Sequence, residues 1–158
     1  MWNSVFIAVH AAAAVVAFAA GALSLRSGHY LRTYRTAIAV MAAALLPAVL
    51  VDWATTDVVA RIVFSGLLGL AAAMVLRAEL AGRRSPATTG GPTATYLHHV
   101  GFTLIALADG FAVVSAVRLG LPGWAVGVLA VGVVLAGQAG VAAVERRSVG
   151  RPAPVAAR

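Results

Sequence analysis

Apolar residues gather in five long runs along the chain. They cover residues 4–25, 36–53, 58–80, 96–117 and 121–144. Each run is close to the roughly 20 residues with which an α-helix crosses about 30 Å of hydrocarbon. The linkers between the runs are short, and only the third, AGRRSPATTGGPTAT, has the composition of a flexible loop. The pattern predicts an all-α fold, a polytopic membrane bundle of five transmembrane helices.

Composition supports this interpretation. Of the 158 residues, 61% are hydrophobic and only 11% are charged, which is far more apolar than an ordinary soluble domain. The net charge of +7 comes from arginines that lie mostly between the apolar runs or after the last one, so it has a topological explanation and indicates no nucleic-acid partner. A sequence without cysteine has no disulfide, no thiolate metal site and no cysteine nucleophile. We expect an integral membrane protein in contact with the lipid bilayer.

The arginines lie mainly on one side of the predicted membrane. By the positive-inside rule, the N-terminus lies outside and the C-terminus in the cytoplasm, in a bacterial cytoplasmic membrane. Residues 1–147 form one transmembrane domain, and residues 148–158 form a disordered cytoplasmic tail. Of the twelve arginines, the ten on the inner side are Arg26, Arg32, Arg35, Arg77, Arg83, Arg84, Arg146, Arg147, Arg151 and Arg158, and the two on the outer side are Arg61 and Arg118.

The first run has a rival interpretation as a secretory signal peptide, because AFA at residues 17–19 resembles a cleavage site. The segment MWNSV before the run has no positive charge, and the first arginine follows the run. A signal peptide has the opposite polarity, so we expect a retained helix.

Ionisable residues inside the apolar runs are candidates for function, because placing them in hydrocarbon is costly. Asp109 lies well inside the fourth run, on the same helix face as His98, since eleven residues make almost three whole turns. In the outer layer, His10 and Arg61 complete a polar cluster with Asp109. A proton or ion pathway is one interpretation. The other, which we favour, is that these side chains satisfy each other or backbone carbonyls and transport nothing.

Three histidines lie in the inner layer of the membrane. His29 follows the first run, and His98 and His99 open the fourth. Two neutral imidazoles from different helices can ligate the two faces of a b-type haem. The sequence requires no cofactor, and haem b is the alternative that these histidines allow. Zinc is less favoured because no thiolate or acidic partner lies near them.

Small residues spaced four apart indicate close helix crossings, within a protomer or between two. The clearest pairs are Ser65 with Gly69 and Gly123 with Gly127. Such crossings fit a homo-oligomer or a partner in a membrane complex as well as a single bundle.

Two further residues interrupt the apolar runs. Pro47 has no N–H and withdraws one backbone hydrogen bond, so it predicts a kink in the second helix. Gln138 in the last run is expected to hydrogen-bond a neighbouring helix.

The stretch VHAAAAVVAFAAGALSLRSGHYLRTYRTAIAVM, residues 9–41, resembles the opening of a family of small bacterial membrane proteins grouped as a domain of unknown function. The resemblance implies a multi-span membrane protein with His10 and His29 as positions of interest, and it implies no reaction. The matching positions are His10, Gly21, Ala22, Leu23, Arg26, Gly28, His29 and Met41.

These patterns favour a non-enzymatic function. The sequence has no GxSxG, HExxH or phosphate-binding loop motif and no evident pair of carboxylates. We therefore expect an accessory subunit or a small carrier, with polar residues buried between its helices. The alternative is a redox protein that uses b-type haem or quinone through the inner histidines.

Overall fold

The computed structural model describes residues 2–51, 53–54 and 57–149, and these residues form helices without any strand. All helices except the short α4 are long and apolar enough to cross a membrane. This confirms the predicted bundle of five apolar helices. The helices are α1 (Trp2–Ser27), α2 (Leu31–Leu50), α3 (Val58–Arg83), α4 (Pro86–Thr89), α5 (Ala94–Arg118) and α6 (Gly123–Val149).

The predicted bounds of the second helix, 36–53, are wrong, because α2 begins at Leu31 and ends at Leu50. Arg32 and Arg35 suggested a loop at its start. Leu31 and Tyr34 alternate with these arginines at helical spacing, and both are buried. Long arginine side chains reach outward while their backbone stays helical, so the helix includes them.

The linkers differ from expectation in two ways. The turn between α1 and α2 is short, and Gly28 ends α1 with a φ of +68°, a conformation that favours glycine. The third linker, expected to be a flexible loop, contains α4, whose Pro86 packs against that turn: a Cβ added to Gly28 would lie 3.1 Å from Pro86 Cδ. At the other end of the chain, α6 runs to Val149, and residues 150–158 of the predicted tail lie outside the described residues.

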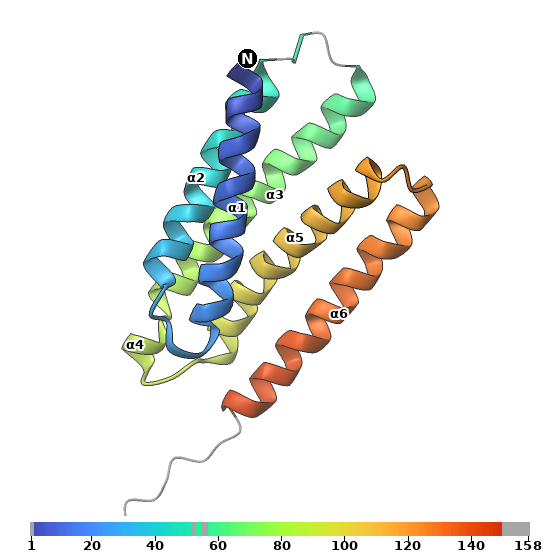
Figure 1. Cartoon of the computed structure of the whole chain (residues 1–158). Coiled ribbons are helices and arrows are strands. Elements are labelled where there is room, and N and C mark those ends of the chain that lie inside the picture. Colours follow the sequence, from blue (N-terminus) through green and yellow to red (C-terminus); the bar gives the residue numbers. More distant parts are fainter. Residues whose placement is uncertain (1, 52, 55–56, 150–158) are drawn as a thin grey trace, which may run out of the picture.

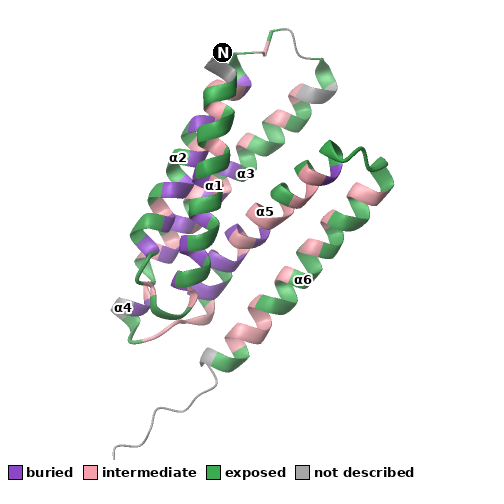
Figure 2. Cartoon of the chain, in the orientation of Figure 1, coloured by how far each residue is buried: buried purple, intermediate pink, exposed green. Residues whose placement is uncertain are grey.

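The helices pack closely at one end of the bundle and spread toward the other (Figure 1). We call the closely packed end the Arg-rich end; it carries the α1–α2 turn, α4 and the C-terminal end of α6. Buried residues concentrate there (Figure 2). The hydrophobic core consists of residues within 13–20 of α1, 31–41 of α2, 74–81 of α3 and 96–100 of α5.

Helix α6 lies at the edge of the bundle and packs against α5. None of the described residues in its apolar span is buried. The two helices approach through reciprocal glycine contacts. A Cβ added to Gly101 of α5 would lie 2.5 Å from Val141 Cγ2, and one added to Gly137 of α6 would lie 2.5 Å from Ile105 Cγ1.

We predict that Gly101→Ala and Gly137→Ala each destabilise the protein by about 1–3 kcal/mol, because β-branched side chains in helices have few rotamers with which to yield. Gly132→Ala is the matched control, since a Cβ there meets nothing within 4 Å. We expect this control to stabilise α6 by about 0.5–1 kcal/mol. Thermal unfolding in detergent, followed by circular dichroism, measures all three. Equal stability of Gly137→Ala and Gly132→Ala would contradict the close contact of Gly137 with Ile105.

Candidate functional site

Four fully buried polar residues lie between three helices at the Arg-rich end. Ser24 comes from α1, Tyr34 from α2, and Tyr96 and Thr103 from α5. We call them the buried tyrosine cluster. Tyr34 and Tyr96 head the largest fully buried side chains of the structure.

Both phenol groups of the cluster donate a hydrogen bond: Tyr96 directly to a backbone carbonyl, and Tyr34 to Thr103, which in turn donates to one. The Tyr96 hydroxyl donates to the Ser24 carbonyl oxygen at 2.8 Å. The Tyr34 hydroxyl bonds Thr103 Oγ1, and the Thr103 hydroxyl donates to the Val100 carbonyl at 2.8 Å. Because the Thr103 hydrogen is used in that bond, Tyr34 is the donor to Thr103. These bonds tie α5 to both α1 and α2.

Small residues of α1 make room for the cluster. Ala17 is fully buried, and a Cβ added to Gly21 would lie 3.0 Å from both Tyr34 Cδ2 and Leu104 Cδ2. The Tyr34 ring and Leu104 of the same chain therefore approach this small face of α1 closely.

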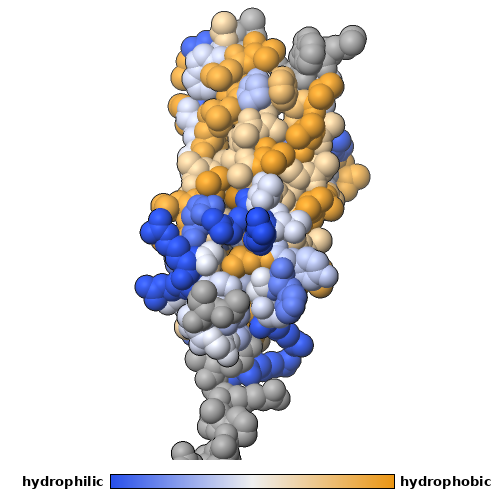
Figure 3. All heavy atoms as spheres, turned by 90° about the vertical axis from the view of Figure 1, so that its left-hand side faces the viewer, coloured by the Kyte–Doolittle hydropathy of each residue, from blue (hydrophilic) through white to orange (hydrophobic). Residues whose placement is uncertain are grey.

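Charged groups surround the cluster toward the edge of the bundle. Arg35 of α2 forms an ion pair with Glu79 of α3, and Arg77 of α3 lies with its Cζ 4.9 Å from the centre of the Phe102 ring. Hydrophilic side chains gather in the lower part of the face shown in Figure 3, below a mainly apolar surface. Exposed ion pairs of this kind contribute little stability. They mark where the helices leave the apolar zone.

Among the described residues, no hydrogen bond or ion pair joins the predicted outer residues His10, Asp109 and Arg61 to one another. His10 Nδ1 lies 2.9 Å from the Met41 carbonyl oxygen, so the His10 ring ties α1 to α2. Arg61 donates from Nη2 to the carbonyl of Ala54 at 3.3 Å. Asp109 Oδ1 is buried and has no hydrogen-bond partner among the described residues. The expectation that a backbone carbonyl satisfies His10 agrees with these contacts, and the expected pair of His10 with Asp109 is absent from them.

The three inner histidines have different surroundings. His98 Nε2 lies 3.4 Å from Glu145 Oε2 of α6. His99 follows it directly on α5 and so points about 100° away, and its Nδ1 is buried without a partner among the described residues. His29 is exposed in the α1–α2 turn. Within the described chain, no group of three or more His, Cys, Asp or Glu side chains is arranged to hold a metal ion.

The predicted small-residue pairs are open within the protomer. A Cβ added to Gly69, Gly123 or Gly127 would meet nothing within 4 Å, and Ser65 is exposed. Crossings between protomers or with a partner stay a prediction. Pro47 lies inside α2, which continues to Leu50, and the kink there also stays a prediction.

Comparison of the chain with protein-family models, with curated proteins and with solved structures finds no match. The resemblance of residues 9–41 to a family of unknown function therefore stays a prediction.

The buried tyrosine cluster holds three helices together by hydrogen bonds. Its phenol hydrogens are committed to bonds inside the bundle, and its members are shielded from solvent and lipid. From the sequence, the inner histidines were singled out and the role of Thr103 was missed. The available signal was its spacing, because Thr103 lies seven residues, or nearly two turns, after Tyr96 and so on the same face of α5.

We predict that Thr103→Val costs more stability than Tyr34→Phe. Valine fills the space of threonine but leaves the buried Tyr34 hydroxyl without its acceptor, at a cost of about 1–3 kcal/mol. Tyr34→Phe leaves Thr103 bonded to Val100 and costs about 1 kcal/mol. The double variant Thr103→Val with Tyr34→Phe should recover most of the loss of Thr103→Val. The unfolding free energies of the four proteins, measured in detergent, form a double-mutant cycle. Strictly additive losses would contradict the hydrogen bond between Tyr34 and Thr103.

Proposed function

We propose that this protein is a non-enzymatic accessory subunit of a membrane complex, and that α6 binds a transmembrane helix of its partner. The observation that carries the proposal is the exposed Gln138 near the middle of α6. The Arg-rich end lies in the cytoplasm and the N-terminus outside, in a bacterial cytoplasmic membrane, because eight of the ten arginines among the described residues lie toward that end.

Gln138 shares a face of α6 with open glycines. Gln138 and Gly127 are eleven residues apart, which is three turns and about 20°. Gly123 lies about 40° from Gly127. All three residues are exposed, and neither glycine meets another side chain at its Cβ position. We call these three residues the open face of α6.

The open face is unfavourable for a helix that meets only lipid. Gly127 lies in the interior of α6, where glycine is about 0.8–1.0 kcal/mol less favourable than alanine, and no contact within the protomer offsets that cost. A carboxamide in hydrocarbon has no water with which to hydrogen-bond. Small residues that let backbones approach, together with a polar side chain that bonds across, are the features of helix interfaces in membranes.

A carrier and a haem protein receive less support. The His10 ring has an acceptor within its own chain, and Arg61 donates from Nη2 to the Ala54 carbonyl, although Arg61 Nε is buried without a partner among the described residues. The haem alternative pairs His29 with His98 or His99; His29 is exposed in the α1–α2 turn, and His98 lies 3.4 Å from Glu145 Oε2 rather than facing another imidazole. Ligation of haem on both faces needs two imidazoles on opposite sides of the ring.

We predict that Gln138→Leu raises the stability of the isolated protein but weakens its complex. Leucine removes an unpaired amide from lipid, whereas the loss of an interhelical hydrogen bond of about 0.6–2 kcal/mol reduces association about 3- to 30-fold. Blue-native electrophoresis of gently solubilised membranes measures the fraction of the protein in the complex. Gly127→Leu, which fills the open face, should reduce that fraction as well.

Gly132→Leu is the matched control, because Gly132 is equally open but lies about 140° from Gly127 around α6, off the open face. It should leave the complex intact. Migration of the wild-type protein as a monomer, or a species of twice its mass that contains only this chain, would contradict the accessory role. An absorption spectrum of the same material tests the alternative: a Soret band that shifts on reduction would favour haem over the proposed function.

The proposed orientation predicts opposite labelling of two cysteine variants. The natural chain has no cysteine, so each variant carries a single reactive thiol. We expect a membrane-impermeant maleimide to label Ala54→Cys from outside intact cells and Gly91→Cys only after the cells are opened. Both positions lie in linkers, and Gly91 has open space at its Cβ position. Labelling of both from one side would contradict a single membrane crossing by α3 and with it the five-span topology.

A further inference from the structure

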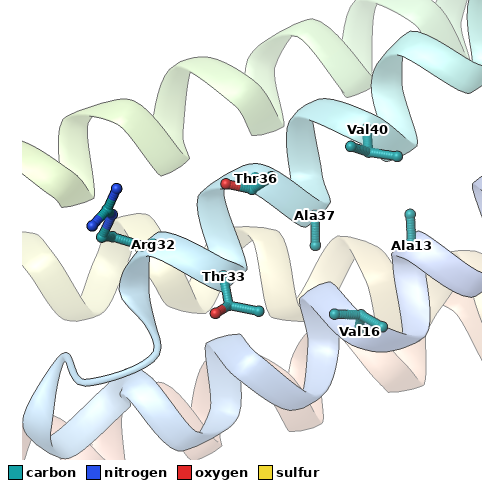
Figure 4. A pocket seen from close by; sticks show the side chains of 7 residues that line it. All are labelled: Ala13, Val16, Arg32, Thr33, Thr36, Ala37 and Val40. Carbon is teal, nitrogen blue, oxygen red and sulfur yellow. The ribbon is translucent and has the colours of Figure 1, made fainter.

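A groove of about 480 Å³ runs between α1 and α2. Figure 4 shows its lining side chains, with Ala13 and Val16 from α1 and the others from α2. Arg32 and Thr33 lie at the end next to the α1–α2 turn, and Ala13 and Val40 lie at the other end. The lining residues are Ala13, Val16, Arg32, Thr33, Thr36, Ala37 and Val40.

The groove changes from polar to apolar along its length. Arg32, Thr33 and Thr36 occupy the first turns of α2, at the Arg-rich end. Ala37 and Val40 follow toward the middle of the bundle. Arg32 is exposed and forms no ion pair with an acidic side chain among the described residues. One end of the groove thus offers a free positive charge and hydroxyl donors, and the rest offers only hydrocarbon.

We propose that this groove binds one anionic phospholipid of the leaflet at the Arg-rich end. The phosphate lies at Arg32 with the hydroxyls of Thr33 and Thr36, and one acyl chain lies along Val16 and Val40. A guanidinium group has the donor geometry that phosphate oxygens accept. The proposal does not depend on an accessory role, because the groove lies on α1 and α2 and not on α6.

The length and direction of the groove match a lipid in that leaflet. Arg32 and Val40 are separated by about 12 Å along the helix axis. Half of the hydrocarbon thickness is about 15 Å. A phosphate held at the membrane boundary by Arg32 therefore places its acyl chain beside Val40, near the middle of the bilayer. A soluble phosphate would use only the polar end and leave the apolar part empty.

The test measures lipid retained by the full-length protein. The protein is reconstituted with equimolar phosphatidylglycerol and phosphatidylcholine, extracted in mild detergent and examined by native mass spectrometry. We expect one retained phosphatidylglycerol per chain, in preference to phosphatidylcholine. Arg32→Gln should reduce this retention at least about tenfold, as expected for hydrogen bonds to a charged group. Arg147→Gln, which alters an exposed arginine outside the groove, should not.

A second pair of variants tests the acyl-chain part of the groove. Val16→Phe fills the groove and should also reduce retention, whereas Val15→Phe adds the same bulk to an exposed neighbour that does not line it. Circular dichroism confirms that each variant is folded. Equal retention by Arg32→Gln and Arg147→Gln, or by Val16→Phe and Val15→Phe, would overturn the proposal. So would displacement of the lipid by excess inorganic phosphate, which would indicate a site for phosphate alone.

Discussion

Two phenol groups enter the space between three apolar helices, where neither water nor lipid can accept their hydrogens. An unsatisfied polar group in hydrocarbon is costly, so each phenol must find an acceptor on a neighbouring helix. Tyr34 finds Thr103, and Tyr96 finds the carbonyl of Ser24. These bonds fix how α1, α2 and α5 are rotated about their axes. The small residues Ala17 and Gly21 then follow, because only a surface without bulky side chains can accept the tyrosine rings.

This constraint explains why the bundle is packed at one end. The buried tyrosine cluster and the core residues around it lie at the Arg-rich end. Toward the other end, the contact of His10 with Met41 ties only α1 to α2. Lipid can cover apolar side chains there at no cost, so nothing forces the helices together where polar groups are few. The spread of the helices and the peripheral position of α6 are consequences of where the bonding groups lie.

The number and approximate position of the spanning helices could be predicted, because length and hydropathy are local properties of the sequence. The start of α2 could not, since two arginines hide the helical spacing of Leu31 and Tyr34. The polar contacts between helices were also beyond the sequence. Tyr34 and Thr103 are 69 residues apart, and no local pattern pairs them. In the sequence, the ionisable residues His10 and Asp109 were the candidates. In the structure, the fully buried hydrogen bonds between helices are made by hydroxyl groups, which apolar helices tolerate easily.

The contacts of the glycines in α6 could not be predicted from the sequence either, and they define the open face of α6. In the sequence, Gly137 and Gly127 look alike. In the structure, Gly137 lies under Ile105, and Gly127 faces open space. The difference is the rotation of α6, which an apolar environment does not set, because lipid and protein interior are similarly apolar. Its rotation is set by the glycine contacts with α5 and by Glu145 at His98. That rotation turns Gln138 outward, although a carboxamide would gain a partner by turning inward. An amide that faces hydrocarbon gains a hydrogen-bond partner only when another helix covers it, which is why we assign that face to a partner.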